Sequence, residues 1–211
     1  MADPLVGAGF AGLLLAGGGL LLVLLVGPTA FVSPAMWNGP QDVSLRLIAR
    51  HAVLWKAANT GFALATVLTA AGLFLVPGLV GDRGTSLAWA AAVGFVLAAS
   101  PWLVVLAIRL TITPGVAAGF AADGVVDPAF VSIDRLSGAL FPPFMLVASG
   151  SIVALGAAIV LGGSLAVGLG WACVVAGVLM GGGYLLLGDM LPAFVYFPTT
   201  AVGIALLLAS T

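Results

Sequence analysis

Residues 4–27 read PLVGAGFAGLLLAGGGLLLVLLVG and decide the fold of the chain. This stretch holds no charged side chain and is as long as the roughly 20 apolar residues that an α-helix needs to cross a bilayer core. Its glycines would weaken a helix in water, but in lipid small residues let helices pack closely. Its amino end has neither the basic flank nor the cleavage site of a secretory signal peptide, so we expect it to be retained. The stretch is therefore a predicted transmembrane helix.

The composition extends this pattern to all 211 residues. Hydrophobic residues make up 63% of the chain and charged residues 6%, with 30 glycines, and the mean hydropathy is +1.30. A water-soluble domain of this length needs far more charged surface. The net charge of −1 provides no attraction to a polyanion, so we expect no nucleic-acid partner. The sequence predicts an all-α, polytopic integral membrane helical bundle.

Apolar runs divide the chain into about six spans that form a single transmembrane domain, 1–211. The spans are predicted at about 4–27, 55–76, 87–109, 136–161, 165–188 and 192–208. Between the first two spans, residues 42–54 are amphipathic and should project from the membrane or lie along its surface. Residues 111–135 hold two prolines and three aspartates, and we expect a structured loop there.

The basic residues predict the orientation in the membrane, because short cytoplasmic loops carry an excess of Arg and Lys. Five of the six bases fall in the connections that follow the first and third spans, and only Arg83 falls on the other side. These five are Arg46, Arg50, Lys56, Arg109 and Arg135. We therefore expect a multi-pass protein of the cell membrane with both termini on the non-cytoplasmic side.

A faint internal repeat has a spacing of 82 residues. This shift places Phe62 on Phe144, and it places Trp89 on Trp171. Spans two and three would then be a parallel copy of spans four and five. Chance matches are common in a chain rich in Ala, Gly, Leu and Val, so a repeat and a coincidence both remain open.

Residue counts exclude several kinds of chemistry. His51 is the only histidine and Cys173 the only cysteine, so we expect no metal site, haem or other cofactor. Ser149 within a span, and Asp189 after Gly188, each match a fragment of an intramembrane protease site. Neither has a convincing catalytic partner in the sequence. An enzyme is the least expected class.

A polar cluster is predicted at the cytoplasmic ends of the spans. Its members would bind an anionic lipid headgroup or ligand, or would only anchor the helices at the interface. The candidate binding residues are Arg50, His51, Lys56, Asn59, Arg109 and Arg135, with Asp134 and Asp189 as their charge partners. On a helical wheel His51, Trp55 and Asn59 share one face, which we expect to point into the bundle.

Prolines within two spans lie beside aromatic residues. Pro101 precedes Trp102, and the Pro142–Pro143 pair lies between Phe141 and Phe144. Proline kinks a transmembrane helix, so these rings would line a pocket or would pack the core.

Two functions agree with these features. The first is a non-catalytic accessory or structural subunit of a membrane complex, which would contact other membrane chains or itself. The alternative is a small carrier or a lipid- or small-molecule-binding protein that uses the basic cluster. Membrane lipids are expected partners in both cases.

Overall fold

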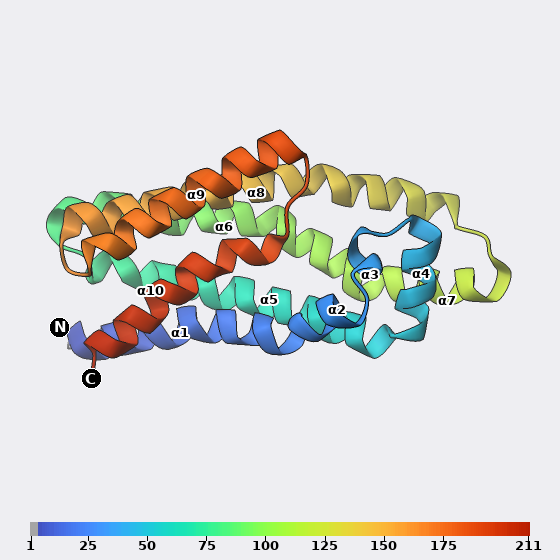
Figure 1. The fold of residues 1–211 in the computed structure, drawn as a ribbon, viewed down its shortest axis with the longest axis horizontal. Helices are drawn as coiled ribbons and strands as arrows, with labels where there is room; N and C mark the ends of the chain where they lie inside the picture. The colour runs from blue at the N-terminus through green and yellow to red at the C-terminus, as the bar shows by residue number, and fades with distance from the viewer. Residues whose placement is uncertain (1–3) are drawn as a thin grey trace.

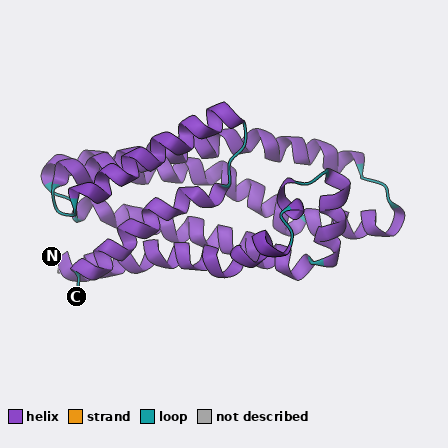
Figure 2. Cartoon of the chain, viewed as in Figure 1, coloured by secondary structure: helices purple, strands orange, loops and turns teal. Residues whose placement is uncertain are grey.

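The computed structural model describes residues 4–211, without the side chains of residues 4 and 30–32. In this part of the chain helices are joined by short loops, and no strand is present (Figure 2). The elements in chain order are α1 (Pro4–Leu25), α2 (Gly27–Val32), α3 (Ala35–Asn38), α4 (Gln41–Arg50), α5 (Ala52–Leu75), η1 (Val76–Gly78), α6 (Asp82–Thr111), α7 (Thr113–Asp123), α8 (Pro128–Gly162), α9 (Val167–Leu187), η2 (Pro192–Val195) and α10 (Tyr196–Ala209).

Six segments among the described residues are long and apolar enough to cross a membrane, which confirms the predicted helical membrane bundle. They are Leu5–Thr29, Ala52–Gly78, Asp82–Asp123, Pro128–Gly162, Val167–Leu187 and Pro192–Ala209. Lipid offers no hydrogen-bond partners to backbone N–H and C=O groups, and a helix satisfies these groups within itself. The fold is therefore that of a multi-pass membrane protein.

The six spanning helices lie along the long axis of the molecule (Figure 1). Both termini lie at one end of this axis, whereas α3, α4 and α7 gather toward the other, which we call the cap end. The short cap helices share an apolar cluster with the first turns of α5 and α8. Its buried members are Met36, Leu45, Ile48, Trp55, Ala117, Phe120 and Phe130.

The spanning helices differ in length, and this difference shapes the cap end. With 21 residues, α9 is about 32 Å long, close to the bilayer core of about 30 Å. The 35 residues of α8 extend over about 52 Å. Figure 1 shows α9 ending part-way along α8, before the chain turns back into α10. Only some of the helices therefore continue toward the cap end.

The predicted loop at 111–135 is largely helical in the structure. Pro114 and Pro128 each lie in the first turn of a helix, where a missing N–H costs nothing. The Oδ1 atom of Asp127 accepts a hydrogen bond from the N–H of Ala129 at 2.8 Å and caps α8. Gly124, at φ 75°, ends α7. The prolines that suggested a loop therefore begin helices.

The predicted amphipathic stretch 42–54 is interrupted at His51. This residue has φ −123° and ψ 39°, outside the helical region, and separates α4 from α5. A helical wheel drawn through this point is not valid, so the predicted shared face of His51, Trp55 and Asn59 is wrong. Trp55 and Asn59 are buried, whereas His51 is exposed.

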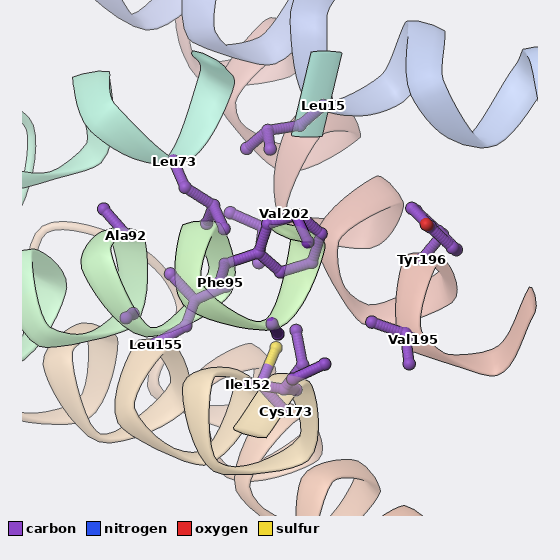
Figure 3. Packing of buried hydrophobic residues seen from close by; sticks show 14 of the residues in the cluster. Leu15, Leu73, Ala92, Phe95, Ile152, Leu155, Cys173, Val195, Tyr196 and Val202 are labelled. Atoms are coloured by element: carbon purple, nitrogen blue, oxygen red, sulfur yellow. The ribbon is translucent and has the colours of Figure 1, made fainter. Parts of the chain in front are cut away.

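The main core lies where the spanning helices meet around small and aromatic side chains. Leu73, Phe95 and Val202 are fully or almost fully buried there, together with Ile152 (Figure 3). Thr66 Oγ1 and the hydroxyl of Tyr196 share a hydrogen bond of 2.6 Å between α5 and α10. The same core therefore joins both halves of the chain.

Glycines let the helix backbones touch. A Cβ atom at Gly203 of α10 would lie 2.5 Å from the backbone nitrogen of Ala16 in α1. At Gly156 of α8 a Cβ atom would lie 2.7 Å from the backbone nitrogen of Val174 in α9. Only glycine fits such approaches, as is typical of helix pairs in lipid.

The two proposed copies of the repeat, α5–α6 and α8–α9, run in the same direction along the long axis (Figure 1). Matched positions have matched surroundings: Phe62 and Phe144 are buried, and Trp89 and Trp171 are exposed. The helices differ in length, with 24 and 30 residues in one pair and 35 and 21 in the other. The repeat stays a prediction.

The glycine contacts lead to a stability prediction. We expect Gly156→Ala to lower the free energy of unfolding by about 1–3 kcal/mol, because the added methyl group collides with the backbone of α9. Circular dichroism during denaturation in detergent measures this change. Gly150→Ala in the same helix is the matched control, since no atom lies within 4 Å of its Cβ position. Equal losses of stability in the two variants would contradict the proposed packing.

Candidate functional site

A cavity of about 940 Å³ opens between the spanning helices and the cap. Its size is at the upper end of that of small-molecule sites in proteins. Its walls come from both halves of the chain. The lining residues are Leu22, Val23, Val26, Gly27, Pro28, Trp37, Asn38, Gly39, Phe62, Val105, Ile108, Arg109, Thr113, Asp134, Ser137, Gly138, Phe141, Tyr184, Gly188, Asp189, Met190, Leu191, Pro192, Ala193 and Phe197.

Helix lengths give the distance of the charged wall of the cavity from the opposite end of the bundle. Gly81 and Gly162 touch at the end of the bundle opposite the cap. From there, α6 reaches Arg109 and the antiparallel α8 reaches Asp134, each after about 40 Å at about 1.5 Å per residue. A bilayer with its headgroups is about 40–45 Å thick. The distance of both side chains from that end of the bundle therefore matches the thickness of a bilayer with its headgroups.

Arg109 is the cation of the cavity wall, and tryptophans hold it in place. The centre of its guanidinium group lies 5.7 Å from the ring centroid of Trp37 and 5.4 Å from that of Trp102. The Nε1–H of Trp55 donates a 2.7 Å hydrogen bond to the carbonyl oxygen of Arg109. Cation–π contacts of this kind strengthen as water is excluded. Arg109 is partly buried, so one side of its guanidinium can remain accessible.

Trp37 is fixed by the end of the first spanning segment. Its Nε1–H donates to Thr29 Oγ1 at 3.0 Å, and that hydroxyl donates to the carbonyl oxygen of Val26 at 2.6 Å. The Trp37 ring also packs against Trp55, with centroids 4.8 Å apart. The proline-rich segment after α1 is thereby held over the cavity.

Aromatic rings form much of the remaining wall. Phe62 packs edge-on against Trp102 at 5.6 Å, and Trp102 stacks on Phe144 at 4.8 Å. Phe141 contacts both Trp102 and Tyr184, with centroids 5.9 Å apart in each case. The rings beside the prolines therefore have both roles that the sequence left open, lining a pocket and packing the core. Phe141 lines the cavity, and Trp102 and Phe144 pack behind it.

Two carboxylates complete the set of charges. Asp134 lies on α8, and Asp189 follows Gly188, whose φ of 71° ends α9. Both are exposed and line the same cavity as Arg109. Among the described residues, Arg109 has no carboxylate oxygen within 4.0 Å of its guanidinium nitrogens. The cavity therefore presents one positive and two negative groups without direct pairing to Arg109.

The structure brings together three of the eight predicted site residues. Arg109, Asp134 and Asp189 line the cavity. Outside its lining lie the exposed Arg50, His51, Lys56 and Arg135 and the buried Asn59. Asn59 Nδ2 donates to the carbonyl oxygen of Trp55 at 2.9 Å, so this amide supports the tryptophan that holds Arg109.

Three polar residues of the wall were not predicted from the sequence. Asn38, Thr113 and Ser137 lie in segments interpreted as loops or helix ends. Ser137 was within reach of prediction, because it lies three residues after Asp134 and the same helical face continues to Phe141. No sequence signal pointed to Asn38.

No protein-family model, curated protein or solved structure matches this chain. The fold and the site define its class as a multi-pass helical membrane protein with a charged and aromatic cavity between bundle and cap.

The accessibility of the cavity can be tested by thiol labelling in a Cys173→Ala background. We expect Ser137→Cys to react with a water-soluble maleimide, because residue 137 lines the open cavity. Ser149→Cys on the same helix is the control, since Ser149 is 3% exposed within the bundle and should not react. Mass spectrometry of the intact protein measures the adduct. An unreactive cysteine at position 137 would indicate that the cavity is closed to water.

Proposed function

We propose that this protein binds a membrane amphiphile that carries an anionic group, and that it serves as a small carrier or lipid-binding protein. The observation that carries the proposal is Arg109, a cation held by tryptophan rings in the wall of a large cavity. In the described part of the chain no carboxylate forms a salt bridge with this guanidinium, which is therefore suited to a phosphate or carboxylate of a ligand.

The apolar wall supports an amphiphile over a small hydrophilic ion. Leu22, Val23 and Val26 on the α1 side and Val105 and Phe197 on the opposite elements would contact an alkyl chain. Such a chain would lie toward the membrane core while its charged end stays at the headgroup level. The aromatic wall between the two ends matches the amphipathic rings favoured at membrane interfaces.

We further propose that the cap end faces the cytoplasm across the cell membrane. Five of the six bases lie in α4 or in the parts of α5, α6 and α8 next to the cap, and Arg83 lies in the first turn of α6, which begins at the other end. This distribution follows the positive-inside rule and would place both termini outside.

The proposal leads to a test in which the protein is extracted gently from its membrane and studied by native mass spectrometry. We expect the wild type to retain an amphiphile and Arg109→Gln to lose most of it. Arg135→Gln is the matched control, because Arg135 is exposed and lies outside the cavity lining. A partner chain at fixed stoichiometry with no bound amphiphile would instead support the accessory-subunit function.

A second pair of variants fills the cavity without changing charge. Gly138 lines the cavity and its Cβ position is free of contacts with other elements, so Gly138→Leu should project its side chain into the space. We expect this variant to fold and to retain less amphiphile. Gly150→Leu on the same helix has equal room, lies outside the cavity lining and should bind as the wild type does. Full retention by the Gly138 variant would contradict binding in this cavity.

A further inference from the structure

We propose that the bound amphiphile is zwitterionic, a phospholipid whose phosphate binds Arg109 and whose ammonium group binds Asp134 and Asp189. This inference rests on the proposed function and adds the chemistry of the headgroup. The basic residues of the sequence suggested a purely anionic ligand. Four of the six predicted binding residues are exposed and lie outside the cavity, and Asn59 is uncharged, so Arg109 is the one cation among them that lines it.

The charges of the cavity carry the argument. Its lining holds the single cation Arg109 and two carboxylates, so the net charge of the wall is negative. A headgroup with only a negative charge would be attracted by Arg109 and repelled by both aspartates. A headgroup with a phosphate and an ammonium group can place each charge beside its opposite. Complementarity with both signs therefore favours the zwitterion.

The two kinds of charge come from different helices, with Asp134 near enough for its negative charge to act on Arg109. Arg109 lies on α6, beneath Trp37 of α3. Asp134 lies on α8 and Asp189 follows α9. One end of a headgroup would thus face α6 while the other faces α8 and the end of α9.

The face of α8 provides room for the ammonium end. Residues 134, 137, 138 and 141 follow the spacing of a single helical face, and all four line the cavity. Gly138 lies between Asp134 and Phe141 on this face, and no atom of another element lies within 4 Å of its Cβ position. The Ser137 hydroxyl is a further acceptor beside Asp134, and an ammonium group with three N–H donors needs several acceptors.

The test uses the full-length protein in nanodiscs that contain equal amounts of phosphatidylethanolamine and phosphatidylglycerol with the same acyl chains. Native mass spectrometry after release reports which lipid stays bound. We expect the wild type to retain phosphatidylethanolamine preferentially. In the Asp134→Asn/Asp189→Asn double variant this preference should fall by about tenfold, the loss typical of a charge-assisted contact, while lipid binding persists.

The control is Asp42→Asn/Asp82→Asn, which removes the same charge outside the cavity lining and should keep the wild-type preference. Thermal denaturation verifies that each variant is folded. Two outcomes would overturn the zwitterionic headgroup but not lipid binding. In the first, the wild type prefers phosphatidylglycerol. In the second, the double variant keeps the wild-type preference. Retention of neither lipid by the wild type would overturn the proposed function itself.

Discussion

Close contact between helix backbones is the interaction on which the rest of this structure depends. Lipid provides little hydrophobic driving force between helices, so packing and interhelical hydrogen bonds must hold the bundle together. Glycine makes this packing tight, as at Gly203 between α1 and α10 and at Gly156 between α8 and α9. These contacts fix the positions of the long helices, and the cavity walls follow from them.

The cavity is a consequence of unequal helix lengths in a bundle of fixed packing. The 21 residues of α9 suffice to cross the bilayer core, whereas α6 and α8 continue beyond it. Space is left where α9 ends, and the cap covers it from the other side. Trp55 links these parts, since its ring belongs to the cap cluster and its N–H binds the carbonyl oxygen of Arg109.

Hydropathy was sufficient to predict the helical membrane bundle, because the length of an apolar run is itself the physical requirement for crossing a bilayer. It could not predict the cavity, which depends on contacts between distant segments such as Trp37 and Arg109. Arg109, Asp134 and Asp189 were identifiable because charges at the ends of apolar runs are conspicuous. The break at His51 was not, since no proline or glycine marks it in the sequence.

Among the described residues, Arg109 is held by tryptophan rings and not by a salt bridge, and this leaves its charge free to bind a ligand. A salt bridge would neutralise the arginine and a carboxylate together and leave neither for a ligand. The faces of Trp37 and Trp102 stabilise the cation without supplying a formal negative charge. In the proposed complex, Asp134 and Asp189 would act on a separate part of the ligand. Aromatic support for one charge thus lets both signs coexist in a single cavity at the membrane interface.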